Sequence, residues 1–358
     1  MNRFMDKKTL KWIKGDGPYP DIVFTSRIRL ARNLVNIAFP PRARRDDLKK
    51  SQKQVDAAYS SHPYFLARKG SSYKNRFVRL ELDSLSQMDK VLLAEEYIAS
   101  PAFINEKGAR SVYFNSDASV SFMVNEEDHL RMQALLPGLQ IDKAWGLVNK
   151  LDDALEAKLD FAYSKNLGYL STCPTNLGTG MRASVMLHLP AITMMNLIAK
   201  IAPRIFQLGL AIRGIYGEGT EAQGHFYQIS NQVSLGLKEE DIIEKIKGIT
   251  LQIIEQENKT RESILKDLSW QVKDRVWRSW GILKSARILS MEESLELLSM
   301  IRLGVGMGIL PKIPVSMLNE LVLLIRPVYL QKTTGRILDP KALELKRADV
   351  IRKRVSKY

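Results

Sequence analysis

Arginine, carboxylate and glycine residues are the groups in this 358-residue chain that could do chemistry, and they gather in four segments. The segments read TSRIRLAR at 25–32, NEEDHLR at 125–131, STCPTNLGTGMRASV at 171–185 and RGIYGE at 213–218. They supply the cations Arg27, Arg29, Arg131, Arg182 and Arg213 and the carboxylates Glu127 and Glu218. Guanidinium forks match phosphate oxygens, and paired carboxylates suit a planar cationic substrate. A site for a triphosphate beside a cation is therefore possible, provided that the four segments converge.

The first two segments also have ordinary structural interpretations. In a strand, Arg27 and Arg29 point to the same face, because side chains alternate, and that face could simply be solvated. At 125–131, Asn125 could cap a helix over 126–136, which would place Glu127 and Arg131 on one helix face. Neither segment by itself distinguishes a functional site from an ordinary element.

The other two segments are equally open. The glycine-rich loop could hold an anion at the start of an apolar helix expected over 182–201, with Arg182 in its first turn. It could instead be an ordinary loop with a free thiol, Cys173. The RGIYGE segment could be a hairpin turn with incidental charges.

Elements that could position these residues follow from the apolar pattern. Helices are expected over 46–59, 84–99, 126–136, 142–164 and 182–201, and strand pairs within 110–124 and across 208–216 and 226–235. From residue 238 the pattern is helical, with further helices at 290–304, 314–327 and 339–358. The chain therefore predicts an α+β fold, an antiparallel or mixed sheet flanked by helices, over 1–237, followed by an all-helical region over 238–358.

Composition bounds the class of protein. The chain has 54 Lys+Arg against 39 Asp+Glu, a formal charge of +15, which favours polyanionic partners such as nucleotides. One cysteine and no apolar run long enough to span a membrane predict a soluble cytoplasmic protein. P-loop, ordinary protein-kinase and zinc-site motifs are missing, and the four histidines lack ligand spacing, so no metal held only by protein ligands is expected.

The four segments together resemble the motifs of phosphagen (guanidino) kinases, in order and in spacing, across roughly residues 20–237. Within that family the chain is most similar to the bacterial protein-arginine kinase branch. The arginine pair begins at Arg27, which leaves no room for the helical domain that precedes it in kinases of small guanidino compounds. A helical region also follows the catalytic segments, as it does in that branch.

The resemblance implies a curved antiparallel sheet flanked by helices, and transfer of the γ-phosphate of ATP to the guanidinium of a protein arginine. Mg²⁺ would arrive with the nucleotide. The five arginines would hold the phosphates, and Cys173 would lie against the substrate guanidinium. Glu127 and Glu218 would grip that guanidinium, with Glu127 favoured as the base and the reverse assignment possible. Further nucleotide contacts would come from Ser26, Ile28, Ala183, Ser184, Val185, Met186 and Tyr97.

The resemblance also implies partners and a setting. These are protein substrates that present arginine, a small zinc-binding activator and a Clp-type AAA+ unfoldase, in protein quality control and the stress response. A homodimer is expected, and a membrane or nucleic-acid partner is not. Two alternatives remain: a kinase of a free guanidino compound such as L-arginine, and a degenerate nucleotide-binding scaffold.

Two positions depart from the branch. Tyr97 stands where the branch usually has a histidine near the nucleotide. The branch also carries an R-D-x-x-R-A motif that senses phosphoarginine, and here residues 343–348 read LELKRA, without the leading arginine. The sequence therefore leaves open whether phosphoarginine regulates this chain.

Overall fold

An antiparallel sheet forms the centre of the first two thirds of the chain. The computed structural model describes residues 10–65, 77–215, 222–311 and 313–358. Among these, eight strands pair in the order β2-β3-β4-β5-β1-β8-β10-β9, each antiparallel to its neighbours. The strands are β1 (Val23–Arg32), β2 (Val78–Glu81), β3 (Ser111–Phe114), β4 (Val120–Val124), β5 (Leu130–Pro137), β8 (Met181–His188), β9 (Leu210–Gly214) and β10 (Phe226–Asn231). The predicted α+β fold with an antiparallel sheet is confirmed.

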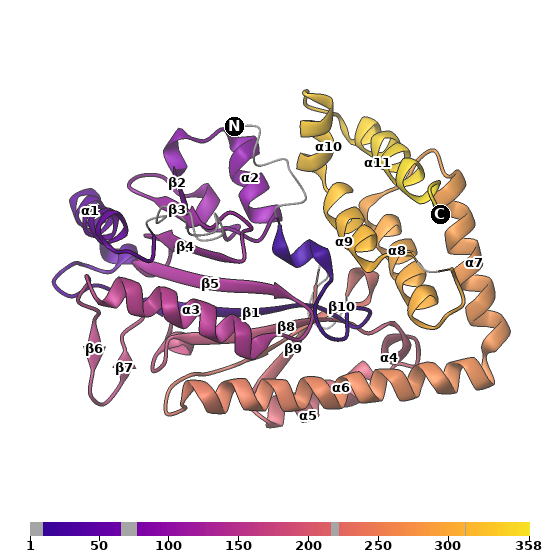
Figure 1. The fold of residues 1–358 in the computed structure, drawn as a ribbon, viewed down its shortest axis with the longest axis horizontal. Helices are drawn as coiled ribbons and strands as arrows, with labels where there is room; N and C mark the ends of the chain where they lie inside the picture. Colours follow the sequence, from indigo (N-terminus) through magenta and orange to yellow (C-terminus); the bar gives the residue numbers. More distant parts are fainter. Residues whose placement is uncertain (1–9, 66–76, 216–221, 312) are drawn as a thin grey trace.

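One face of this sheet is apolar and covered by helices. Alternate residues of the three central strands, including Ile28, Met132 and Val185, are fully buried in one core cluster. The helices α1 (Arg45–Ser61), α3 (Ile141–Glu156) and the first half of α6 (Glu239–Asp267) contribute to the same cluster. Figure 1 shows α3 and α6 running along this side of the sheet. Since strand side chains alternate, the intervening residues face the other way, and there the site is found.

The helix expected over 126–136, and the first part of the helix expected over 182–201, are strands instead. Residues 126–136 do not form a helix but a bend at 126–129 followed by β5, and residues 182–188 belong to β8. Both runs alternate strictly: Leu130, Met132 and Ala134 are buried in the helix-covered core, and Arg131 and Gln133 face away. The helical interpretation was wrong because an apolar-rich run satisfies more than one period, and the pairing of each run with β1 decided between them.

The remaining elements of this region agree with expectation more closely. Helices α1 and α3 occupy the predicted segments, although α3 ends at Glu156, and α2 is shorter than predicted at Gln87–Glu95. Both strand pairs form, as β3 with β4 and as β9 with β10. A two-stranded hairpin, β6 (Tyr163–Ser164) with β7 (Gly168–Tyr169), and two helices, α4 (Pro190–Met194) and α5 (Ile198–Gln207), complete it. Short 3-10 turns include η2 (Lys11–Lys14), η7 (Pro174–Asn176) and η8 (Gln223–His225).

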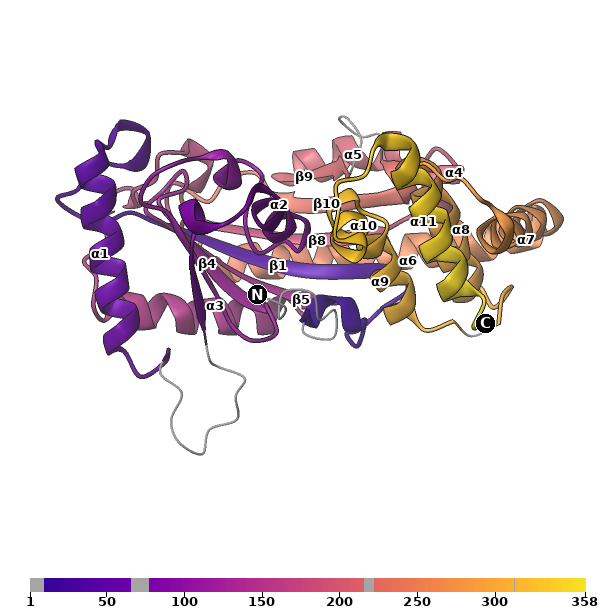
Figure 2. The same ribbon diagram turned by 90° about the horizontal axis from the view of Figure 1, so that it is seen from above.

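The last third of the described chain is helical, as predicted. It consists of α6, α7 (Ser269–Ser285), α8 (Met291–Gly306), α9 (Val315–Leu324), α10 (Pro327–Thr334) and α11 (Pro340–Val355). Ile242, Ile246 and Ile253 of α6 lie in the sheet-side core, so we propose that α6 be counted with the sheet although it begins just after the predicted division at residue 237. Helices α7 to α11 gather at one end of the sheet, where α10 contacts α2 (Figures 1 and 2).

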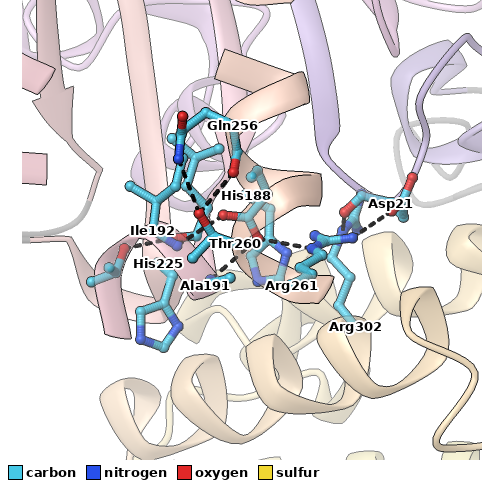
Figure 3. A network of polar contacts seen from close by, with 12 residues as sticks. Asp21, His188, Ala191, Ile192, His225, Gln256, Thr260, Arg261 and Arg302 are labelled. Atoms are coloured by element: carbon cyan, nitrogen blue, oxygen red, sulfur yellow. Dashed lines mark hydrogen bonds and ion pairs between the residues drawn. The ribbon is translucent and has the colours of Figure 1, made fainter. Parts of the chain in front are cut away.

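A buried polar network joins this helical region to the sheet. Glu257 of α6 is fully buried, and its carboxylate accepts hydrogen bonds from the backbone N–H groups of Ala191 (3.2 Å) and Ile192 (3.0 Å) at the start of α4. Arg261, one turn further along α6, donates to Glu257 (2.8 Å) and to Asp21 (2.7 Å), just before β1. Figure 3 shows Arg261 directed toward Asp21, with His188 and Arg302 close by. Within the described residues, no helix is both long and apolar enough to cross a membrane.

Candidate active site

Five arginines share the face of the sheet opposite the α3 and α6 side. Arg27 and Arg29 lie on β1, and Arg29 pairs directly with Arg182 of β8. On the other side of β1, Ala31 pairs with Arg131 of β5. Arg213 of β9 pairs with Gln228 of β10, whose side chain also accepts a hydrogen bond from Arg27 (3.0 Å). The strand register therefore brings together the five cations that the sequence singled out.

These arginines are crowded and poorly neutralised. Burial, together with the charges of Arg131 and Arg182, lowers the pKa of Arg27 to about 10. The pKa of Arg29 is also depressed, first by burial and then by Arg27 and Arg131. Among the described residues, the buried Nε atoms of Arg29 and Arg182 have no hydrogen-bond partner. A buried cation without a partner destabilises the folded state, so a bound polyanion would stabilise this face.

Glu126 is the carboxylate that offsets part of this charge. Its Oε1 atom accepts hydrogen bonds from Arg131 Nη1 (2.5 Å) and from Ser100 Oγ (2.6 Å). Burial alone would raise the pKa of Glu126, but the charge and hydrogen bonds of these partners outweigh it, and the pKa is lowered. The expectation that Glu127 and Arg131 share a helix face was wrong, because residues 126–129 are not helical. No local sequence signal identifies Glu126 as the partner.

Glu127 occupies a different position from its neighbour. It is exposed, and it lines a small cavity of about 80 Å³ together with Arg29, Arg131, Cys173 and Arg182. Its side chain makes no hydrogen bond to any described residue, whereas its backbone carbonyl accepts one from Thr172 Oγ1 (2.9 Å). A free carboxylate at the edge of an arginine cluster can receive a cation without breaking an existing contact.

The loop that carries Glu127 is held by Asp128, not by helix capping. Asn125 has a left-handed backbone (φ 62°), and its side chain is bonded to Ser51 and to two backbone carbonyls. The buried carboxylate of Asp128 accepts hydrogen bonds from Ser171 Oγ (2.7 Å) and Thr172 N (2.9 Å). These bonds fasten the 125–129 loop to the loop before η7, and they explain why Glu127 and Cys173 line one cavity.

Cys173 is half-buried in that second loop. Its Sγ atom lies 3.1 Å from Thr175 Oγ1, and it lines the small cavity together with Arg182. Arg182 is a strand residue of β8, and not part of a first helical turn as expected. Cys173 and Arg182 therefore line the same cavity, one from the loop and the other from β8.

A larger cavity continues along the arginine face. It has a volume of about 490 Å³, and its lining includes Arg27, Arg29, Tyr97 and Arg131. A narrow recess beside it is lined by Arg27 and Tyr97 together with Ser184, Met186 and Gln228. The larger cavity shares Arg29 and Arg131 with the small cavity beside Glu127.

Comparison with known proteins decides the family. The family model for the ATP:guanido phosphotransferase C-terminal catalytic domain matches residues 65–260, and that for the protein-arginine kinase McsB C-terminal domain matches residues 269–358. A protein-arginine kinase of Halothermothrix orenii is 46% identical over 352 residues, 98% of each chain. The chain belongs to the protein-arginine kinase branch of the ATP:guanido phosphotransferases.

Other relatives agree with this membership. A protein-arginine kinase of Symbiobacterium thermophilum is 42% identical and covers 99% of both chains. Among solved structures, lombricine kinase has a TM-score of 0.58 at 22% identity, with 71% of this chain and 70% of that chain covered. The duplicated taurocyamine kinase of Schistosoma mansoni has a TM-score of 0.60 at 21% identity, with 79% and 41% covered. These two structures support the fold alone, and they confirm the expected phosphagen-kinase architecture.

Not every residue predicted for this protein-arginine kinase site points into it. Ile28, Ala183 and Val185 are fully buried in the helix-covered core, on the opposite face of the sheet. Ser26 is also buried, and it donates to the carbonyl of Gly138 (2.7 Å). Their side chains therefore do not line the cavities of the arginine face, and they support the strands that carry Arg27, Arg182 and Ser184. Tyr97, Ser184 and Met186 do line the cavities, and their roles in binding stay predictions.

Two further predictions depend on segments away from the cavities. Glu218 lies outside the described residues, so its role stays a prediction carried by the family resemblance. In the LELKRA stretch of α11, Arg347 is buried and donates to the carbonyls of Ile325 (2.9 Å) and Leu289 (2.9 Å). That arginine therefore holds α11 against its neighbours.

Among the described residues there is no group of three or more His, Cys, Asp or Glu side chains that could hold a metal ion.

A pH dependence of stability is expected from His129, which sits beside the Glu127 loop. Its Nδ1 atom accepts a hydrogen bond from Leu34 N (3.1 Å), and burial lowers its pKa from 6.5 to about 4. The folded protein therefore keeps His129 neutral. The contribution of neutral His129 to the free energy of unfolding is complete above pH 6.5. It is lost as the pH falls toward 4, and the total loss is up to about 3 kcal/mol.

His129→Asn tests this expectation, because an asparagine oxygen can accept the same bond from Leu34. Urea midpoints measured from pH 8 downward should fall less steeply in the variant than in the parent below about pH 6.5. The difference at pH 8, where the histidine is neutral in both states, gives the cost of repacking alone. His188 and His225 also have lowered pKa values, so only part of the slope should disappear. Parallel profiles would contradict the assignment.

Proposed function

We propose that this chain transfers the γ-phosphate of ATP to the guanidinium of arginine residues in proteins. The observation that carries the proposal is the free, exposed carboxylate of Glu127 at the edge of a cavity lined by Arg29, Arg131 and Arg182. A phosphate donor fits the arginines, and a cationic acceptor fits the carboxylate. Membership of the protein-arginine kinase branch supports an arginine held in a protein as that acceptor.

The reaction needs each of these groups. A free guanidinium is protonated at neutral pH and is not nucleophilic. In the proposed step, Glu127 takes a proton from the substrate nitrogen as the N–P bond forms, and the bond from Pγ to the bridging oxygen of ADP breaks. Arg29, Arg131 and Arg182 stabilise the charge on the phosphates, and positioning supplies most of the rest of the catalysis. Magnesium carried by the nucleotide supplies further charge neutralisation when bound.

The arginine cluster presents a difficulty that the carboxylates resolve. An arginine substrate must approach a site that already holds several cations, and the Coulomb repulsion at short range is severe in a partly buried cavity. Glu126 neutralises Arg131 from inside the site, and Glu127 offers an unused negative charge at its mouth. On the family resemblance, we assign Glu218 as the partner that orients the guanidinium and Cys173 as a group lying against it.

The proposed test is direct labelling. The full chain is incubated with Mg·ATP and an arginine-rich protein, and the products are examined by mass spectrometry under neutral conditions that preserve N–P bonds. Phosphoarginine on the protein is the expected result. Phosphorylation of free L-arginine without labelling of protein would favour the free guanidino compound as substrate. Absence of ATP turnover together with salt-dependent binding of DNA would favour a scaffold.

The setting of this activity is also a proposal. A cytoplasmic role in protein quality control, with a zinc-binding activator, a Clp-type unfoldase and a homodimer formed through the helical region, rests on the family resemblance. Size-exclusion chromatography with light scattering would test the dimer. Activity of the isolated chain, compared with and without candidate activators, would test the need for a partner.

A further inference from the structure

Tyr97, which lines the 490 Å³ cavity and the recess beside it, is held in an uncommon backbone conformation. Its φ is 61°, in the left-handed region that bulky residues rarely adopt. Such a conformation costs free energy and persists only where surrounding contacts hold it. Something outside the local sequence must therefore hold this tyrosine.

Three distant segments supply those contacts. Gln133 Nε2 of β5 donates to the Tyr97 carbonyl (2.5 Å), and the ring of Trp12 in η2 meets the tyrosine ring edge-on, with centroids 5.5 Å apart. The third contact comes from the helical region, where Arg326 Nη2 donates to the Tyr97 hydroxyl (2.8 Å). The position of the ring is thus set by tertiary contacts on several sides.

Arg326 is well placed for this task. It is the residue immediately before α10, it is 7% exposed, and it is separated from Tyr97 by 229 positions in the sequence. Its guanidinium lies over the tyrosine ring, 5.2 Å from the centroid, and Nη1 donates to the carbonyl of Glu95 (3.0 Å) at the end of α2. Arg326 therefore donates hydrogen bonds both to Tyr97 and to the end of α2, the helix that precedes this tyrosine.

Arg326 also reaches the cavity itself. It lines the 490 Å³ cavity together with Arg27, Arg29, Tyr97 and Arg131, so the wall of that cavity contains a side chain from the helical region. The face of an aromatic ring is a good platform for a nucleobase, and its orientation matters because stacking is short-ranged. Loss of Arg326 would remove the hydrogen bond from its Nη2 atom to the Tyr97 hydroxyl and lessen the restraint on the ring.

We infer that Arg326 is a positioning residue for the nucleotide, which fixes Tyr97 as part of the binding wall and so makes the helical region part of the ATP site. The inference rests on the proposed function, since it assumes that the cavity beside Arg27 receives the nucleotide. It assigns Arg326 no contact with the reacting atoms. Its effect is expected on nucleotide affinity and not on the transfer step.

A purely structural role for Arg326 is the competing explanation, because it also joins α10 to α2. The contact between α10 and α2 also offers a matched control. Lys332, near the end of α10, forms an ion pair with Asp89 of α2 and lines neither cavity. Lys332→Gln therefore weakens the contact between α10 and α2 and leaves Tyr97 and the arginine face unchanged.

The test measures the Kd of the full chain for a fluorescent ATP analogue with Mg²⁺, together with the KM for ATP and kcat on the arginine-rich protein. Arg326→Gln should raise the Kd and the KM for ATP about tenfold, which equals 1.4 kcal/mol, and leave kcat at saturating ATP largely unchanged. Lys332→Gln should bind the analogue like the parent. Tyr97→Phe, which removes only the hydroxyl, should weaken binding in the same direction, and adding it to Arg326→Gln should cause little further loss.

Several results would overturn the inference. Unchanged nucleotide affinity in Arg326→Gln would do so, as would an equal loss in Lys332→Gln, or a fall in kcat at unchanged KM. If Arg326→Gln fails to fold, Tyr97→Phe still tests the same hydrogen bond, and parent-like affinity in that variant would count against the proposal. Failure of the proposed function would look different, because it would show as nucleotide binding without phosphoarginine in the parent chain.

Discussion

Glu127→Gln should lower the rate of phosphoarginine formation at least about 100-fold, the scale of general acid–base contributions. The amide keeps the shape of the side chain but cannot take a proton from the substrate guanidinium. It also removes the exposed negative charge of Glu127 from a cavity lined by Arg29, Arg131 and Arg182. The nucleotide should still bind, because the arginines that hold the phosphates are untouched. Rates are measured at saturating Mg·ATP, and nucleotide affinity is measured separately.

Glu156→Gln provides the matched control for this prediction. Glu156 is another exposed carboxylate of the sheet-bearing region, at the end of α3, and it lines a cavity other than the arginine ones. Its variant should retain parent activity. Normal turnover in Glu127→Gln would rule out the proposed proton transfer to this residue. Normal turnover in Glu127→Gln with a large loss in Glu218→Gln would move the base to Glu218.

Glu257→Ala should destabilise the fold by about 3–5 kcal/mol, the usual cost of removing one partner of a buried ion pair. Glu257 is fully buried, and its carboxylate satisfies the backbone N–H groups of Ala191 and Ile192 as well as Arg261. Truncation leaves the Arg261 cation with Asp21 as its ionic partner. It also removes the carboxylate that accepts hydrogen bonds from the two N–H groups at the start of α4. The readout is the midpoint of the first unfolding transition in urea.

Glu255→Ala is the control on the same helix. Glu255 lies two residues before Glu257, with a side chain 65% exposed, and it pairs with Lys259. A solvent-exposed pair of this kind contributes little, so its removal should leave the unfolding midpoint at the parent value. Similar midpoints for the two variants would show that the buried network does not stabilise the fold as described.

Much of the site could be predicted from residue types and local patterns. In 25–32, the apolar residues alternate with Arg27 and Arg29, which is enough to place both arginines on one face of a strand. The helical texture after residue 238 predicts the helices of the last third of the chain. Four polar segments in a fixed order and spacing indicated the family, which the comparisons confirm. These features are local or depend only on order along the chain.

The tertiary structure decided the features that depend on partners far apart in sequence. Segments 130–137 and 181–188 are strands because both pair with β1, and apolar runs of that length fit a helix almost as well before a partner is known. Glu126 pairs with Arg131, and Glu127 stays free, because Asp128 fastens their loop to residues 171 and 172. Tyr97 is held by Arg326 across 229 positions. Local propensity carries no information about such contacts, because their free energy appears only when the chain has brought the partners together.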